Sequence, residues 1–177
     1  MISQIFYIQD FIEKNDLNFL IEWTKRATPI KDEYGNSPFS FLQTSSDESD
    51  IHNIFLKINQ NVHKTIEDYF LCRVQKEDIC GMIIYPVGSM LPKHIDNVPG
   101  QNIPTPTGYP SRDISSTIYY NDDYIGGEIY FLNQDLKIKP KAGSLIIFPS
   151  NENYPHEVLP VESGIRYSST NFWSIFN

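Results

Sequence analysis

The sequence predicts a mainly β fold with flanking helices (α+β), in which two N-terminal helices brace a barrel or sandwich. After residue 78, short runs rich in β-branched and aromatic residues recur between Gly, Pro, Asn or Asp. Before residue 78, two stretches carry apolar residues at helical spacing. The 177 residues are 40% apolar and 14% aromatic, which is enough for one sizeable core.

The N-terminal part is expected to hold one strand and two helices. Residues 2–9 predict a short strand, and residues 16–27 predict a helix that ends in a basic turn. The polar stretch 28–49 predicts a loop with a strand in "FSFLQ". A second and stronger helix is predicted because apolar residues keep to one face. Those residues are Ile51, Ile54, Phe55, Ile58, Val62, Ile66 and Tyr69.

The C-terminal part predicts about eight short strands. Seven runs mark most of them: "ICGMIIY", "STIYY", "EIYFL", "LKIKP", "SLIIF", "HEVLP" and "IRYSSTNFW". The stretch "KPKAGSLIIF" predicts a hairpin turn between core strands, with Phe148 in the core. The pair Gly126 and Gly127 predicts a turn or a close approach of two backbones.

We expect a single domain over residues 1–177. Residues 1–77 would supply the N-terminal strand and supporting helices, and residues 78–177 the barrel core with the candidate functional residues. The 14 basic and 22 acidic residues give a net charge of −8. This sign disfavours nucleic acid as a partner, because phosphate backbones attract basic surfaces.

Targeting signals and cysteine usage favour a cytoplasmic protein. No apolar run approaches membrane-spanning length, and the N-terminus has no basic segment before its apolar residues. Two cysteines, Cys72 and Cys80, cannot build a disulfide framework, and their spacing fits no zinc pattern. We read them as reduced thiols, with a single disulfide between them as the alternative.

Two of the four histidines suggest a metal site. His94 and Asp96 are two residues apart, so on a strand both side chains project from one face. With His156 from a distant strand they would form a two-His, one-carboxylate triad, which is typical of non-heme Fe(II) oxygenases. The same ligands would suit a zinc hydrolase. His52 and His63 lie off the apolar stripe of the second helix and predict solvated or packing roles.

Arg166 stands at the start of the last predicted strand, among apolar residues. These neighbours predict a partly buried arginine, and a buried cation needs an anionic partner. A guanidinium matches a carboxylate with its planar fork of donors. The alternative interpretation is a surface salt bridge.

Four segments carry a resemblance to a known family: "YPVGSMLPKHIDN", "IYYNDDYIGGEIYF", "KAGSLIIFPS" and "PHEVLPVESGIRYSSTNFW". Together they resemble the Fe(II)/2-oxoglutarate-dependent oxygenases, and most closely the prolyl 4-hydroxylase branch, which includes oxygen-sensing prolyl hydroxylases. The resemblance implies a double-stranded β-helix (a jelly-roll, cupin-like barrel). It also implies Fe(II), 2-oxoglutarate and O2, with ascorbate as a candidate reductant.

The resemblance implies roles for individual residues. His94, Asp96 and His156 match the iron ligands of the family. Arg166 matches the basic residue that holds the far carboxylate of 2-oxoglutarate. These four residues are the predicted catalytic set.

Further residues match positions near the cosubstrate. Tyr85 and Tyr119 match tyrosines that face 2-oxoglutarate, although a slip of one residue would place Tyr120 there instead. Ser168 shares a strand face with Arg166 and could add a hydroxyl. Ser115 departs from the threonine common in prolyl hydroxylases, which leaves its role open.

The predicted activity is hydroxylation of an unactivated C–H bond, with release of succinate and CO2. A prolyl residue of a protein or peptide is the favoured substrate, and residues 97–113 predict either a substrate lid or a disordered loop. One alternative is an oxygenase acting on a free amino acid, another small molecule or a nucleobase. A second is a non-catalytic cupin-like binding module. The oligomeric state has no signature in the sequence.

Overall fold

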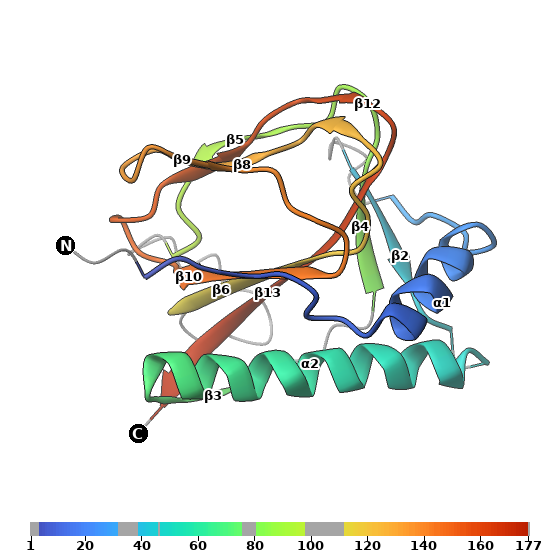
Figure 1. The fold of residues 1–177 in the computed structure, drawn as a ribbon, viewed down its shortest axis with the longest axis horizontal. Helices are drawn as coiled ribbons and strands as arrows, with labels where there is room; N and C mark the ends of the chain where they lie inside the picture. Colours follow the sequence, from blue (N-terminus) through green and yellow to red (C-terminus); the bar gives the residue numbers. More distant parts are fainter. Residues whose placement is uncertain (1–3, 32–38, 46, 76–80, 98–111, 177) are drawn as a thin grey trace.

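Two antiparallel β-sheets face one another in the computed structural model of the chain, and two helices lie beneath the larger sheet (Figure 1). The structure describes residues 4–31, 39–45, 47–75, 81–97 and 112–176. The expectation of a mainly β fold with two helices is confirmed.

The larger sheet has seven strands. Along the sheet they are β1 (Phe6–Ile8), β10 (Ser144–Pro149), β6 (Ile114–Tyr119), β13 (Arg166–Phe176), β4 (Gly81–Tyr85) and β2 (Ser40–Gln43), while β3 (Arg73–Gln75) pairs with the far end of β13. Because β6 and β13 are central, both carry neighbours on each side.

The smaller sheet has four strands and covers the opposite side of the interior (Figure 1). Their order is β5 (Leu91–His94), β11 (His156–Val158), β8 (Ile129–Phe131) and β9 (Leu136–Ile138). A separate pair joins β7 (Ile125–Gly126) to β12 (Val161–Ser163). The described part of residues 78–177 holds ten strands, whereas the sequence pattern predicted about eight. Several of the ten have only two or three residues, which is too short to be recognised in the sequence.

The helices are α1 (Lys14–Thr24) and α2 (Ser49–Phe70). Buried apolar residues of α2 pack with residues of the larger sheet in one core. Phe55 of α2 joins the two helices to the sheet, because its ring lies 5.7 Å from Trp23 of α1 and 6.1 Å from Tyr120 beyond β6. Tyr69 departs from the expected stripe: it is half-exposed and packs edge-on against Phe6.

Strand β6 is buried along its whole length, because both of its faces are covered. Ile114, Ile118 and the following Tyr120 join the core formed with the helices. Thr117 and Tyr119 face the interior between the two sheets instead. Strand alternation thus gives one face to packing and leaves the other for chemistry.

The predicted hairpin in "KPKAGSLIIF" is wrong. Strand β9 pairs with β8 in the smaller sheet, whereas β10 pairs with β1 and β6 in the larger one. The chain therefore crosses between layers at this point. Phe148 does lie in the core, 1% exposed, where it packs against Phe131.

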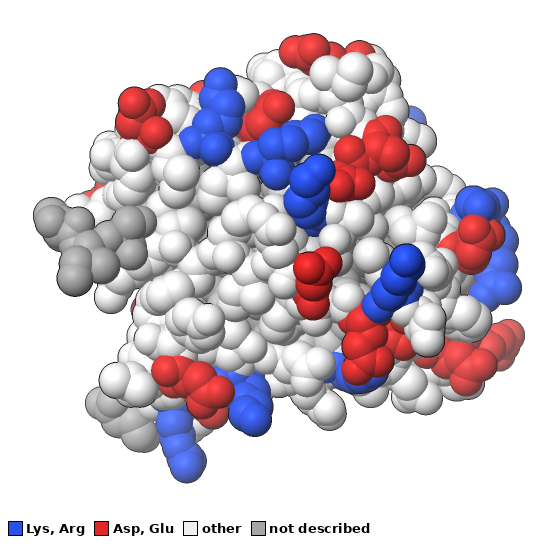
Figure 2. Space-filling model, in the orientation of Figure 1, with Lys and Arg blue, Asp and Glu red and all other residues white. Residues whose placement is uncertain are grey.

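Charges and cysteines add two observations. Acidic and basic side chains are interspersed over the face shown in Figure 2, so this face carries no broad basic surface. Neither helix of the described chain combines the length and apolar character needed to cross a bilayer. Cys72 is a free thiol, which agrees with reduced cysteines and not with the alternative of a disulfide between Cys72 and Cys80. Cys80 itself lies outside the described residues.

The packing of α2 against the larger sheet predicts a large cost for removing Ile66. Its side chain is fully buried, so Ile66→Ala should lower the free energy of unfolding by about 2–5 kcal/mol. Ile125→Ala is the matched control, since Ile125 is 60% exposed, and a change within ~0.5 kcal/mol is expected. Urea unfolding of both variants provides the measurement. Equal losses in the free energy of unfolding would contradict the placement of Ile66 in the core between α2 and the larger sheet.

Candidate active site

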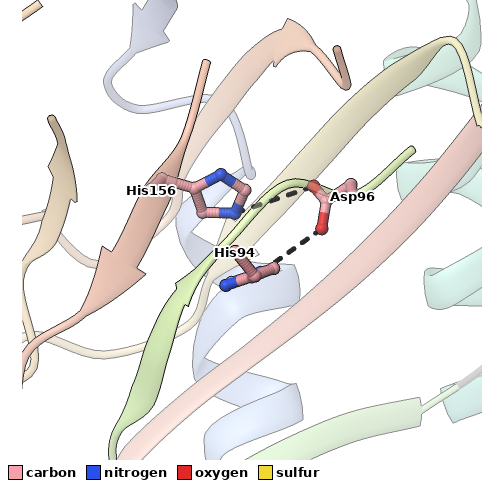
Figure 3. A group of neighbouring side chains, drawn as sticks. All are labelled: His94, Asp96 and His156. Atoms are coloured by element: carbon pink, nitrogen blue, oxygen red, sulfur yellow. Dashed lines mark ion pairs between the residues drawn. The ribbon is translucent and has the colours of Figure 1, made fainter. Parts of the chain in front are cut away.

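Three predicted ligands meet at one end of the space between the sheets (Figure 3). His94, Asp96 and His156 each place one ligand atom so that all three lie within 4.8 Å of one another. The His94 Nε2 atom is 3.4 Å from Asp96 Oδ1, and the His156 Nε2 atom is 3.7 Å from Asp96 Oδ2. Two imidazole nitrogens and one carboxylate oxygen on one side of a point are a donor set that could hold a metal ion.

Strand pairing brings the two histidines together. His94 ends β5 and stands directly opposite His156, which begins β11. Asp96 lies beyond the end of β5, so it does not share a strand with His94 as the alternation argument assumed. The backbone of the next residue holds it in place, because the Asn97 N–H donates to the Ser150 carbonyl over 2.9 Å.

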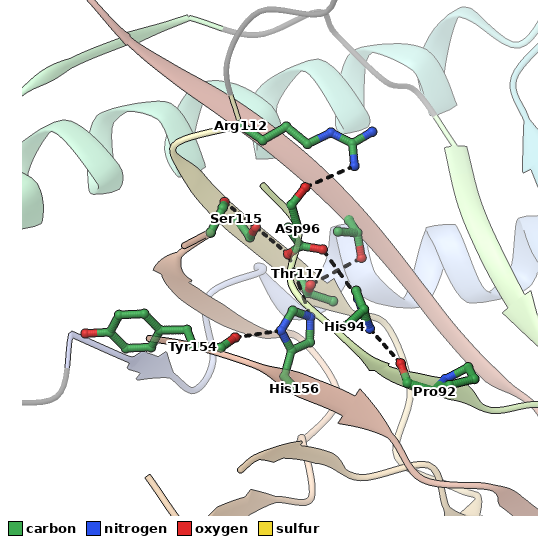
Figure 4. Close-up of polar contacts among 10 residues, drawn as sticks. Pro92, His94, Asp96, Arg112, Ser115, Thr117, Tyr154 and His156 are labelled. Carbon is green, nitrogen blue, oxygen red and sulfur yellow. Dashed lines mark hydrogen bonds and ion pairs between the residues drawn. The ribbon is translucent and has the colours of Figure 1, made fainter. Parts of the chain in front are cut away.

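Each histidine is oriented through its Nδ1 atom (Figure 4). His94 Nδ1 lies 2.8 Å from the Pro92 carbonyl oxygen, and His156 Nδ1 lies 3.1 Å from the Tyr154 carbonyl oxygen. A carbonyl only accepts hydrogen bonds, so each Nδ1 carries the proton. Each Nε2 is then left with its lone pair directed toward the cluster, as metal ligation requires.

The charge states favoured for Asp96 and His156 fit a cation, whereas a proton on His94 Nε2 would compete with it. Burial opposes ionisation of Asp96, but hydrogen bonds from His94 and Ser115 and the charge of His156 outweigh it and lower its pKa. Burial lowers the pKa of His156, which favours the neutral ring. For His94, burial opposes the charged ring, but the hydrogen bonds with Asp96 and the Pro92 carbonyl and the charge of Asp96 together outweigh it and raise the pKa.

A cavity of about 440 Å³ contains this cluster and Arg166 in one lining that both sheets supply. Arg166, the first residue of β13, is only 2% exposed, deeper than the predicted partial burial. Another groove, of about 640 Å³, lies beside α1 and is more open. It contains none of the predicted site residues, so the chemistry belongs to the smaller cavity.

Arg166 is surrounded by aromatic rings and by unpaired polar atoms. Its guanidinium carbon is 4.3 Å from the Tyr85 ring centroid and 4.9 Å from that of Tyr119. No carboxylate in the described ranges pairs with it. Five buried atoms here have no hydrogen-bond partner among the described residues: Tyr119 Oη, Tyr124 Oη, Arg166 Nε, Arg166 Nη1 and Ser168 Oγ. Of these residues, Arg166 and Tyr119 line the cavity and suit a bound anion, whereas Tyr124 and Ser168 lie outside its lining.

The structure places Tyr119, rather than Tyr120, beside Arg166. Tyr119 lines the cavity, whereas Tyr120 lies in the helix-side core, where its hydroxyl is 2.9 Å from Ser169 Oγ. Gly127 lies close behind Arg166: at its positive φ of 64°, a Cβ would stand 3.2 Å from Arg166 Cδ. A side chain there would press on the arginine, which accounts for the glycine.

Three residues near the cavity had no role predicted from the sequence. Ser115, whose role was open, donates to Asp96 Oδ2 over 2.6 Å and lies 2.7 Å from Ser150 Oγ. Arg112 lines the cavity beside Asp96, and its guanidinium carbon is 3.9 Å from the Phe172 ring centroid. Tyr124 lies beside Arg166. The predicted lid over residues 97–113 falls almost wholly outside the described residues.

The family model of the 2OG-Fe(II) oxygenase superfamily matches residues 80–174, which include every residue of the metal cluster and Arg166. The chain belongs to this superfamily. The resemblance seen in the sequence is therefore confirmed. Membership implies Fe(II), 2-oxoglutarate and O2, and the residues fit these groups. The cluster has the required nitrogen and oxygen donors, and the unpaired donors around Arg166 match a carboxylate.

Known proteins similar to the chain are prolyl hydroxylases. Prolyl 3-hydroxylase 2 of Rattus norvegicus is 32% identical over 139 residues, which cover 64% of this chain and 19% of that protein. The chain thus spans about a fifth of the length of the curated relatives it matches.

Two solved structures share its fold. One is the viral collagen prolyl hydroxylase vCPH from Paramecium Bursaria Chlorella virus-1 in its 2OG complex, with a TM-score of 0.73, 20% identity, and coverage of 99% of this chain and 97% of that one. The other is a Trichoplax adhaerens prolyl hydroxylase in complex with a hypoxia inducible factor peptide fragment, with a TM-score of 0.67, 17% identity, and coverage of 98% and 84%.

The hydrogen bond from Ser115 to Asp96 predicts weaker metal binding in Ser115→Ala. Loss of a group that orients a ligand typically weakens metal affinity by about tenfold or more. Ser116→Ala is a matched control, because Ser116 is also buried but accepts a hydrogen bond from Trp173 in the other core. Calorimetric titration with Mn(II) should show weaker binding only for Ser115→Ala. An equal effect of both substitutions would contradict the assigned role.

Proposed function

We propose that the protein is a 2-oxoglutarate-dependent dioxygenase that hydroxylates a prolyl residue of a protein or peptide. One observation carries the proposal: a buried arginine with unpaired donors shares a cavity with the His94, Asp96 and His156 cluster. That combination provides one site for a metal and another for the far carboxylate of a bifunctional acid.

In this proposal, His94, Asp96 and His156 hold Fe(II) through two Nε2 atoms and one carboxylate oxygen. The metal, when bound, would activate O2 together with 2-oxoglutarate, with succinate and CO2 as by-products. Arg166 receives the far carboxylate, and Tyr119, which lines the cavity, can donate its hydroxyl proton to it. Ser168 is fully buried outside the cavity lining, and its hydroxyl is a further proposed donor.

The aromatic walls keep water away from this charge pair. Tyr85 is 4% exposed, and its ring packs between Arg166 and Phe39, with ring centroids of Tyr85 and Phe39 5.1 Å apart. Exclusion of water strengthens the attraction between the guanidinium and a carboxylate. The cavity would therefore favour a dicarboxylic cosubstrate over a neutral one.

The similar proteins support a prolyl substrate, because they are named as prolyl hydroxylases of both 3- and 4-specificity across sequence and structure. The Trichoplax protein holds a peptide fragment. In the chain described here, Arg112 and Phe172 line the cavity near Asp96, and Arg112 can donate to a peptide carbonyl. We therefore favour a peptide over a free amino acid.

The proposal includes the arrangement of the fold. The facing sheets are taken as a jelly-roll barrel, and the helices as its braces, within a single unit of residues 1–177. Support comes from the continuous core between α2 and the larger sheet. A zinc hydrolase with the same three ligands is disfavoured, since it would leave the unpaired donors around Arg166 without a partner.

The proposed reaction predicts a gain of one oxygen atom on a proline-containing peptide. The protein should be incubated with Fe(II), 2-oxoglutarate and ascorbate, and the peptides analysed by mass spectrometry. Amino-acid analysis of the product then separates 3-hydroxyproline from 4-hydroxyproline. Asp96→Ala should form no product, because the metal loses its only carboxylate ligand.

Two results would contradict this proposal in different ways. Succinate formation that depends on free amino acids but not on peptides would replace the prolyl substrate with a small molecule. An absence of succinate with every substrate, together with intact Fe(II) and 2-oxoglutarate binding, would favour a binding module without catalysis.

Arg166→Ala separates the two sites of the cavity. Loss of a bidentate, charge-assisted contact should weaken 2-oxoglutarate binding by about a hundredfold, while Mn(II) binding stays near that of the wild type. Arg73→Ala provides the control, since Arg73 is exposed on β3. Both ligands can be followed by calorimetry. Equal and complete loss of Mn(II) binding in Arg166→Ala would contradict the role given to Arg166.

A further inference from the structure

Tyr124 is a buried phenol close to Arg166 that does not line the cavity. It lies between β6 and β7 and is 5% exposed. Its hydroxyl makes no well-formed hydrogen bond among the described residues, although it lies close enough to Arg166 for a hydrogen bond between them to lower the pKa of Tyr124. The guanidinium of Arg166 acts to lower the pKa of Tyr124, although burial, the larger effect, leaves the pKa raised. A buried phenol without a partner is costly, so its role needs an explanation.

The Tyr124 ring and the Arg166 side chain pack against the same glycine. A Cβ built at Gly127 would stand 3.1 Å from Tyr124 Cε2 and 3.2 Å from Arg166 Cδ. The absence of a side chain at Gly127 therefore allows the ring edge and the arginine stem to share one small space. Because the two side chains are closely packed, a displacement of the Tyr124 ring would displace the Arg166 side chain.

Lys139 holds the ring of Tyr124. Its Nζ atom is 3.5 Å from the ring centroid and donates to the Gly126 carbonyl oxygen over 2.5 Å. A cation over the face of a tyrosine is attracted to its π electrons. The ammonium group thus ties the ring to the turn that contains both glycines.

The donors of Arg166 outnumber what one carboxylate can accept. A guanidinium has five N–H donors and no acceptor, and a bidentate carboxylate uses two of them. Tyr119 lines the cavity and can contact the ligand itself. The Tyr124 oxygen, outside that lining, is left as an acceptor for an N–H that does not face the ligand.

We propose that Tyr124 is a positioning residue for Arg166. Its hydroxyl oxygen accepts one guanidinium N–H and so turns the remaining donors toward the far carboxylate of 2-oxoglutarate. This inference rests on the proposed function. Tyr124 acts through Arg166 and touches neither the metal nor the substrate.

Tyr124→Phe removes the hydroxyl and keeps the ring, with its contacts to Gly127 and Lys139. In calorimetric titrations of the Mn(II)-loaded protein, it should weaken 2-oxoglutarate binding by about tenfold, as expected for a lost hydrogen bond to a charged group. Mn(II) affinity should not change. In turnover, the KM for 2-oxoglutarate should rise more than kcat falls.

A second ligand distinguishes positioning from general loosening of the fold. The acid 2-oxobutyrate has the same metal-binding end but no far carboxylate, so wild type and Tyr124→Phe should bind it equally. Tyr130→Phe is the matched control, because its hydroxyl bonds Asp135 on the surface, and it should bind 2-oxoglutarate as the wild type does. Should Tyr124→Phe not fold, Lys139→Met tests the same unit and should weaken 2-oxoglutarate binding about threefold.

The possible outcomes separate this inference from the proposed function. Unchanged 2-oxoglutarate affinity in Tyr124→Phe, or an equal loss for 2-oxobutyrate, would overturn the positioning role while the proposed function stands. If Lys139→Met stands in, unchanged 2-oxoglutarate affinity has the same meaning. A wild-type protein that binds Mn(II) but not 2-oxoglutarate would overturn both.

Discussion

The cation of Arg166 lies between the two sheets, where no carboxylate of the described chain neutralises it. Burying an unpaired charge opposes folding by several kcal/mol. The faces of Tyr85 and Tyr119 offset part of this cost, because they attract a cation. An anion that enters the cavity could offset the rest of the free-energy cost of burying this charge. The proposed binding of a dicarboxylic cosubstrate would relieve this electrostatic imbalance, which the rest of the fold must hold in place.

Strands β6 and β13 provide that support because each is covered on both faces. On the outer face their residues join α2 in a shared core, which includes Trp173 of β13. On the inner face the same strands present Tyr119 and Arg166 to the cavity. Since alternate residues of one strand serve both purposes, the packing of the helices fixes the orientation of the chemical groups.

The cluster of His94, Asp96 and His156 likewise depends on residues from both sheets. Two backbone carbonyls orient the histidine rings, and Ser115 orients the carboxylate of Asp96 from the central strand β6. The cluster therefore joins the smaller sheet, which carries His94 and His156, to the larger one. The three donor side chains therefore come together only when the two sheets pack against one another, and they do not belong to a single local motif.

Much of the site was predictable from the sequence, because its information is local. Hydrophobic periodicity over a few turns predicted α2, and the residue types at His94, Asp96, His156 and Arg166 carried the family resemblance. The short runs of β-branched and aromatic residues between Gly, Pro, Asn or Asp likewise predicted a mainly β fold. Some short strands were missed, since two or three residues are too few to show a period.

Contacts between distant residues were decided by the tertiary structure alone. Pairing of β6 with β13 determined that Tyr119 faces the cavity and Tyr120 the helices. After β9 the chain passes from the smaller sheet to the larger one, where the sequence had predicted a hairpin. The partner of Ser115 and the place of Tyr124 beside Arg166 also arise from elements far apart in the chain. Sequence patterns record which faces of a segment are apolar, but only the packed layers set which side chains meet across them.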